Sequence, residues 1–90
     1  MVLTTEISVF PNPFEHFVFL EVTCDEPLDC IILLADLGRG KIVRMMGAGL
    51  RSGLNRLSLD GLESLPAGQY QLDIKTISGE VLYQTMLIRS

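Results

Sequence analysis

The chain has 90 residues, of which 48% are hydrophobic and 20% charged, and its formal net charge is −4. This length fits one domain, the apolar content argues against disorder, and the acidic balance argues against nucleic-acid binding, which needs a clustered basic face. No apolar run approaches the ~18 residues of a membrane span. The first residues lack the pattern of a signal peptide, so an exported chain would take its signal from a longer precursor.

Short apolar stretches alternate with turn residues along the chain, and helical periodicity is nearly absent. We expect seven strands, over residues 5–10, 17–23, 30–36, 41–46, 53–59, 68–76 and 81–89. Pro11 and Pro13 end the first strand because neither residue can donate a hydrogen bond to a ladder. The glycines in 38–40 indicate a tight turn. Residues 47–52 read as a loop, and residues 60–65 as a loop or a helical turn.

Seven short strands in a chain of this length predict an all-β fold, an antiparallel β-sandwich of immunoglobulin-like build. Strands of a sandwich bury one face, so Tyr70, Leu72 and Ile74 should lie in the core. Residues 17–20 and 31–34 are apolar at every position, which is typical of strands covered on both faces. Either loops cover their outer faces, or these faces form an interaction surface for a partner or a neighbouring domain.

The charges are separated along the chain. Residues 1–36 carry seven acids and no Lys or Arg, whereas residues 37–59 carry five basic residues and no acid. We interpret this as acidic and basic strands that lie side by side and pair on the surface, rather than as a basic docking face. Exposed pairs of this kind contribute about 0–1 kcal/mol each.

Catalytic and metal-binding patterns find little support. His16 is the one histidine, and it stands just before a strand, where a surface position is the usual interpretation. The carboxylates Asp25, Glu26 and Asp29 do not follow the spacing of an EF-hand, so we interpret them as a solvated acidic loop. The glycines in 38–40 lack the strand–GxGxxG–helix context of a phosphate loop. We therefore expect no enzyme, cofactor or metal.

Cys24 and Cys30 flank the second loop, with a spacing too wide for a CxxC pair. A disulfide across that loop requires Cα atoms within about 7 Å of each other. It is plausible if the two flanking strands form a hairpin, and less so if they cross between sheets. The alternative is two small buried hydrophobes, since free cysteine is among the most buried residue types.

Several short motifs follow one another along the chain in the order found in one known domain family. Ala35 departs from that family's pattern, which has an aromatic residue at this position. The motifs are Pro11-Asn12-Pro13, Asp36 with Gly40, Gly53 with Asn55, Leu65 with Gly68 and Tyr70, and the terminal Leu87-Ile88-Arg89. This ordered set resembles the type A C-terminal sorting domain of the type IX secretion system of Bacteroidetes. The likeness covers nearly the whole chain.

The resemblance implies that residues 1–90 form a single sorting domain, the C-terminal piece of a larger exported protein. Its partners would be the type IX secretion machinery, a sortase-like processing protease and an N-terminal cargo domain. It would pass through the periplasm to the cell surface or the medium. Leu87, Ile88 and Arg89 would carry translocon recognition, by pairing at a strand edge. The alternative is that Leu87 and Ile88 merely complete the core.

A second functional hypothesis is an immunoglobulin-like adhesion or spacer module of a surface protein, including one that binds glycans. A glycan site usually shows exposed aromatic side chains beside carboxylates. The chain has no Trp and two tyrosines, Tyr70 and Tyr83, of which the first should be buried.

Overall fold

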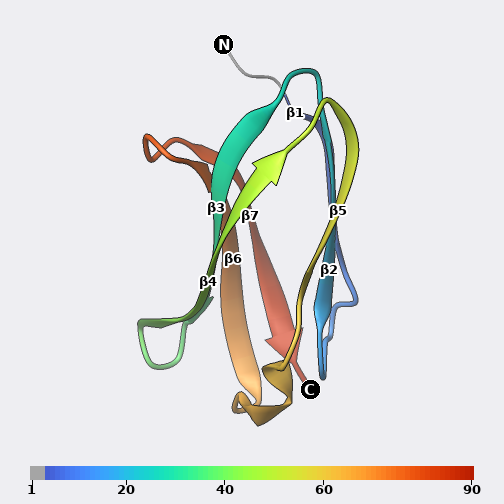
Figure 1. The fold of residues 1–90 in the computed structure, drawn as a ribbon. Helices are drawn as coiled ribbons and strands as arrows, with labels where there is room; N and C mark the ends of the chain where they lie inside the picture. Colours follow the sequence, from blue (N-terminus) through green and yellow to red (C-terminus); the bar gives the residue numbers. More distant parts are fainter. Residues whose placement is uncertain (1–3) are drawn as a thin grey trace.

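The computed structural model describes residues 4–90, which form two antiparallel sheets packed face to face (Figure 1). The three-stranded sheet has the order β1-β2-β5, from β1 (Thr4–Phe10), β2 (Val18–Cys24) and β5 (Gly53–Leu59). The four-stranded sheet has the order β4-β3-β6-β7, from β3 (Leu28–Asp36), β4 (Lys41–Leu50), β6 (Gly68–Thr76) and β7 (Val81–Arg89). A short 3-10 helix, η1 (Leu62–Ser64), lies between β5 and β6. The predicted immunoglobulin-like sandwich of seven strands is confirmed.

β1 and β2 differ from the predicted ranges by one residue at one or both ends, and the boundaries of β3 and β4 differ by more. The segment 47–49 was expected in a loop but belongs to β4, where Gly47 and Gly49 lie opposite Ile31 and Asp29 of β3. β3 likewise begins before residue 30. Pairing with a neighbouring strand supplies backbone hydrogen bonds that override the poor strand propensity of glycine.

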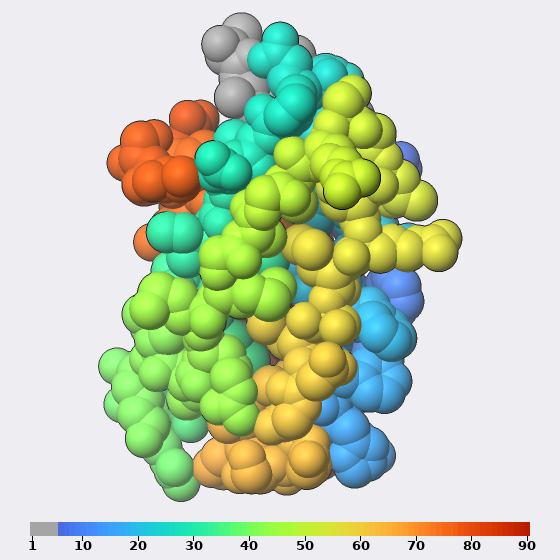
Figure 2. Space-filling view, in the orientation of Figure 1, coloured from blue at the N-terminus to red at the C-terminus, as the bar shows by residue number. Residues whose placement is uncertain are grey.

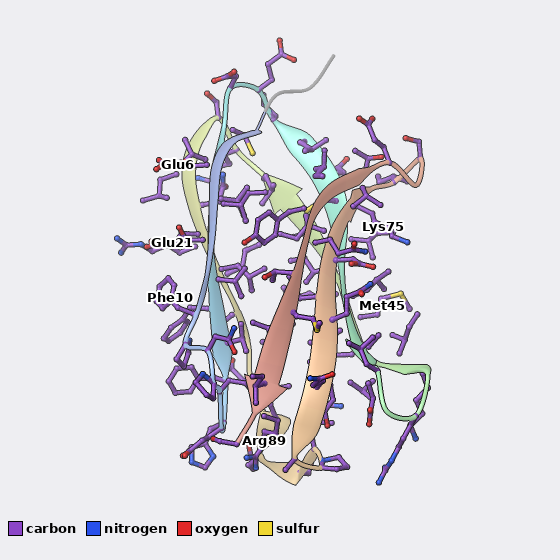
Figure 3. All side chains as sticks on the ribbon, turned by 180° about the vertical axis from the view of Figure 1, so that it is seen from behind. Glu6, Phe10, Glu21, Met45, Lys75 and Arg89 are labelled. Atoms are coloured by element: carbon purple, nitrogen blue, oxygen red, sulfur yellow. The ribbon has the colours of Figure 1, made fainter. Side chains whose placement is uncertain are left out.

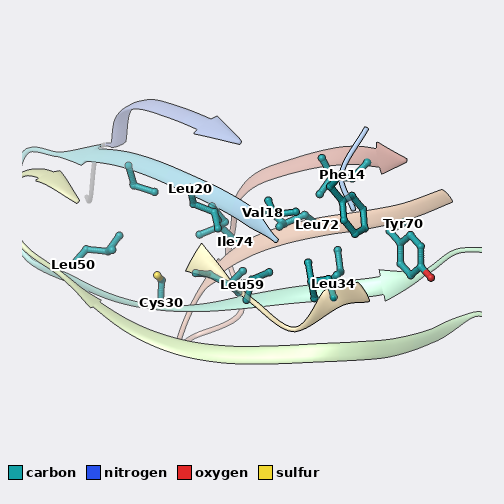
Figure 4. Packing of buried hydrophobic residues seen from close by; sticks show 14 of the residues in the cluster. Phe14, Val18, Leu20, Cys30, Leu34, Leu50, Leu59, Tyr70, Leu72 and Ile74 are labelled. Atoms are coloured by element: carbon teal, nitrogen blue, oxygen red, sulfur yellow. The ribbon is translucent and has the colours of Figure 1, made fainter. Parts of the chain in front are cut away.

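The core lies between the inner faces of the two sheets (Figure 4). Tyr70, Leu72 and Ile74 are all buried there, as their alternation with polar residues predicts. The Phe14 ring, from the loop after β1, meets the Tyr70 ring edge-on with centroids 5.7 Å apart. Such an edge-to-face pair stabilises the fold by about 0.5–1.5 kcal/mol beyond the contribution of the apolar area that it buries.

The two apolar stretches in β2 and β3 do alternate, but their outward residues lie on opposite faces of the molecule. Phe17 and Phe19 are exposed beside the three-stranded sheet, while Ile31 and Leu33 are half-buried on the outer face of the four-stranded sheet. Figure 3 shows these two outer faces, marked by Phe10 and Glu21 on one and by Met45 and Lys75 on the other. The fold's own loops leave Phe17 and Phe19 exposed, so the interaction surface stays a prediction.

Acidic and basic residues pair across neighbouring strands at one position. The Arg56 Nε of β5 donates to Glu21 Oε2 of β2 at 3.0 Å, and the two residues are register partners. This pair agrees with the interpretation of the charge blocks for β2 and β5. It is partly exposed, so its contribution to stability is small.

Cys24 and Cys30 are free, buried thiols. Cys24 ends β2 in one sheet and Cys30 lies in β3 of the other, which is the arrangement that disfavours a bridge. Burial raises the pKa of both thiols above the usual value, with smaller contributions from Asp25 at Cys24 and from Cys24 and Asp29 at Cys30. The two cysteines therefore pack as small hydrophobes.

Side chains of β4 and β5 close one side of the sandwich (Figure 2). Arg44 of β4 spans this side, since its Nη2 donates to the Gly61 carbonyl at 2.9 Å and its Nη1 to the Val43 carbonyl at 2.8 Å. Among residues 4–90, no helix is long and apolar enough to cross a membrane.

Candidate functional site

Asn12 joins the loop after β1 to the end of β7. Its Nδ2 donates to the Met86 carbonyl at 3.1 Å, and its Oδ1 accepts the Ile88 N–H at 3.0 Å. A side-chain amide carries the same donor and acceptor as a peptide group. Asn12 thus takes the place of one residue of a neighbouring strand.

The backbone of Phe14 continues this pairing toward the chain end. Its N–H donates to the Ile88 carbonyl at 2.8 Å, and its carbonyl accepts the Ser90 N–H at 3.1 Å. We call residues 11–14 with residues 86–90 the clasp. The four-stranded sheet ends at β7, whose outward backbone groups would otherwise be unpaired. The clasp therefore protects the terminal part of this edge.

The three predicted recognition residues have different environments within the clasp. Leu87 is 1% exposed and belongs to the core, out of reach of a partner while the domain is folded. Ile88 is 48% exposed, and Met86, which sequence reasoning did not single out, is 54% exposed. The Arg89 guanidinium is bonded to backbone carbonyls of the domain: its Nη2 donates to the Glu63 carbonyl at 3.1 Å and its Nη1 to the Ser90 carbonyl.

A hollow of about 410 Å³ opens beside the clasp, lined by Pro11, Pro13, Glu15, His16, Phe17 and Ser90. The exposed His16 imidazole stands 3.9 Å from the Glu15 carboxylate. The sequence placed His16 at the surface but did not show that it lines the same hollow as Ser90. That arrangement depends on the clasp, which pairs residues more than seventy positions apart.

The motif residues Asp36 and Gly40 form one turn. The Asp36 carbonyl accepts the Gly40 N–H at 2.7 Å, and its Oδ1 accepts the Arg39 N–H at 3.2 Å. Gly40 has φ 66°, a left-handed conformation that favours glycine. The Asp36 side chain therefore orders the reversal between β3 and β4.

Asn55 closes the turn between β4 and β5 in the same way that Asn12 closes the clasp. Its Oδ1 accepts the Arg51 N–H at 2.8 Å, and its Nδ2 donates to the Arg51 carbonyl at 2.8 Å. The Nδ2 also lies 3.2 Å from the carbonyls of Val22 and Gly53. Gly53 has φ 98°, which an L-residue with a Cβ rarely adopts.

Tyr70 forms a tyrosine corner. Its ring is buried, and its hydroxyl donates to the Pro66 carbonyl four residues upstream. The buried Leu65 donates its N–H to the Leu62 carbonyl at 3.0 Å, which shapes the approach to β6. Gly68 then enters β6 with φ 150°. Burial, and to a lesser degree the Asp36 carboxylate, raises the pKa of Tyr70.

Three of these motifs meet at one end of the sandwich. Asp36, Tyr70 and Leu87 are register partners across β3, β6 and β7, and Phe14 packs on Tyr70. The clasp, the tyrosine corner and the Asp36 turn therefore form one continuous layer at the end where the chain terminates (Figure 1). The turn closed by Asn55 lies at the opposite end.

The three carboxylates of the predicted acidic loop lie at the surface. Asp25, Glu26 and Asp29 are exposed around the loop between β2 and β3. Within the part of the chain that the structure describes, no three His, Cys, Asp or Glu side chains gather closely enough to hold a metal ion.

No family model matches the sequence, and the search of the curated proteins finds no match. Solved structures do resemble the fold. A DUF3244 family protein with an immunoglobulin-like β-sandwich fold from Bacteroides vulgatus ATCC 8482 aligns with a TM-score of 0.67 and 15% identity, over 100% of both chains. The GH3 β-glucosidase of Bifidobacterium adolescentis aligns with a TM-score of 0.57 and 11% identity, over 99% of this chain and 17% of that one. At these identities the likeness shows an immunoglobulin-like fold.

Proposed function

We propose that this chain is a non-catalytic sorting domain, which directs an attached cargo through the type IX translocon to the cell surface. A sortase-like protease then processes the exported protein. The observation that carries the proposal is the clasp. The Pro-Asn-Pro turn and the terminal strand, the first and last motifs of the sorting-domain pattern, are bonded into one structural unit.

The position of the clasp suits recognition of a protein that carries a cargo. β1 begins at the end of the sandwich opposite to the end of β7 (Figure 1). A cargo joined before β1 would therefore leave the clasp, its hollow and the exposed side chains of Met86 and Ile88 free for a translocon component. Because Asn12 and Phe14 already occupy the strand edge, we assign recognition to these side chains rather than to backbone pairing.

The test is export of a reporter fused before residues 1–90 in a type IX-competent bacterium. Deleting residues 86–90 would remove the core residue Leu87 as well, so it cannot separate folding from recognition. Met86→Gln with Ile88→Gln removes only exposed apolar side chains. We expect export to fall strongly while Tm changes by no more than about 4–8 °C, the shift for two surface substitutions of about 0.5 kcal/mol each.

Ile42→Gln is the matched control, since Ile42 is 57% exposed on β4, the other edge strand of the same sheet. Its export should equal that of the unaltered domain, and a strain without a functional translocon should export none of the variants. Full export of the Met86 and Ile88 variant would contradict the recognition role of the clasp. Export of the unaltered domain without the translocon would contradict the sorting function itself.

A further inference from the structure

Three of the four phenylalanines in the chain lie outside the core and touch one another. Phe10, Phe17 and Phe19 are 40%, 37% and 41% exposed. Ring centroids are 5.8 Å apart for Phe10 and Phe19 and 4.7 Å apart for Phe17 and Phe19. Phe10 and Phe19 are register partners. Their side chains face outward because Val18 and Leu20 beside Phe19 fill the core and Val9 beside Phe10 packs against it. Figure 3 shows Phe10 on the outer side of the three-stranded sheet.

A groove of about 400 Å³ lies beside Phe10 and Phe19, which line it together with Leu20 and Leu57. Glu21, Arg56 and Ser58 add polar side chains to the same lining. The polar groups are already held in place. Arg56 Nε donates to Glu21 Oε2 at 3.0 Å, and Ser58 Oγ lies 3.2 Å from Asp60 Oδ2.

The shape of the patch favours a small ligand over a protein. With about 200 Å² for a whole phenylalanine side chain, the three rings together expose about 240 Å². Protein interfaces can also centre on a few aromatic residues, so the concave shape beside Phe10 and Phe19 is the deciding observation. Small-molecule sites are concave, span about 300–1,000 Å³, and combine aromatic walls with a few placed polar groups.

We propose that this groove binds a saccharide. A pyranose ring has an apolar face of C–H groups and a rim of hydroxyls, so it matches phenyl rings that lie beside a carboxylate, a guanidinium and a hydroxyl. The Arg56–Glu21 bond uses Nε and Oε2. The Arg56 Nη atoms and Glu21 Oε1 can therefore engage a pair of neighbouring hydroxyls without breaking that bond. The groove is separate from the sorting function, because its polar residues lie on β2 and β5 rather than in the clasp.

The test uses the isolated 90-residue chain and no export. The probes are an array of immobilised plant and bacterial oligosaccharides and then the soluble form of the tightest binder. We expect a bound oligosaccharide that shifts the amide NMR signals of residues 10, 17–21 and 56–58. Phe19→Ala should weaken its binding about tenfold by removing one stacking wall. Arg56→Ala should weaken it to a similar degree while keeping the phenyl cluster.

Met45→Ala is the matched control, because Met45 is 69% exposed on the outer face of the opposite sheet. Binding should be unchanged in this variant. Failure of every oligosaccharide on the array to bind, or binding that survives both Phe19→Ala and Arg56→Ala, would overturn the proposal. A concentration-dependent dimer in sedimentation that Phe19→Ala abolishes would also overturn it and assign the phenyl face to self-association.

Discussion

The side-chain oxygen of Asn12 accepts the backbone N–H of Ile88 across 76 positions of the sequence. The same amide donates to Met86, so one side chain replaces a peptide group of a missing neighbouring strand. Asn55 does the same for Arg51 within a turn. Both asparagines of the motif pattern thus act as peptide mimics, one over a short distance in sequence and one over nearly the whole chain.

Asn12→Ala should lower the free energy of unfolding by about 1–2 kcal/mol. The substitution removes two hydrogen bonds, each with a net contribution of about 1 kcal/mol, but both bonds are partly accessible to water. Urea denaturation measures the change. Asn12→Asp keeps the acceptor for Ile88 but loses the donor to Met86, so its free energy of unfolding should lie between those of the unaltered chain and Asn12→Ala. Equal stability of these three proteins would contradict a stabilising role of the clasp.

Gly53→Ala should cost about 1–2 kcal/mol because of the backbone alone. Gly53 has φ +98°, and nothing lies within 4 Å of the position that a Cβ would take. Gly47→Ala is the matched control, since its added Cβ also meets open space but its backbone is that of an ordinary strand. The control should be neutral or slightly stabilising in the same thermal unfolding measurement. A similar loss at both sites would argue against positive φ as the cause.

Tyr70→Ala should cost about 3–5 kcal/mol, as is typical when a large buried side chain is truncated. Tyr70→Phe keeps the ring and its contact with Phe14 but removes the donor to the Pro66 carbonyl. It should cost about 1–2 kcal/mol. Guanidinium denaturation of both variants separates the packing of the ring from the hydrogen bond. A loss below about 1 kcal/mol for the alanine variant would contradict the core position of Tyr70.

Stability should fall at alkaline pH. Burial raises the pKa of Cys24, Cys30 and Tyr70, so the folded state holds these protons more tightly than the unfolded state does. The free energy of unfolding is then unaffected below the usual thiol pKa of 9.0 and decreases as the pH rises above it. Urea denaturation at neutral pH and at about pH 10 tests the direction. Cys24→Ala with Cys30→Ala should show a shallower decrease, and a steeper one would contradict this account.

The sequence by itself determined the features that depend on neighbouring residues. Period-two alternation identified the inward face of β6 with Tyr70, and the glycines of 38–40 identified a turn that needs positive φ, which Gly40 adopts. The strand count followed from the regular spacing of turn residues. These signals are local, because the pleat and the steric limits on φ act within a few residues.

Only the tertiary structure decided which segments meet. Whether Cys24 and Cys30 face each other across a hairpin or lie in different sheets depends on long-range pairing, which local pattern does not encode. The same pairing extends β4 through Gly47 and Gly49. Alternation requires that Phe10 and Phe19 point outward, but only the register of β1 and β2 brings their rings together. The clasp is the extreme case, since Asn12 meets Ile88 only because the packing of the two sheets brings both ends of the pattern to one edge.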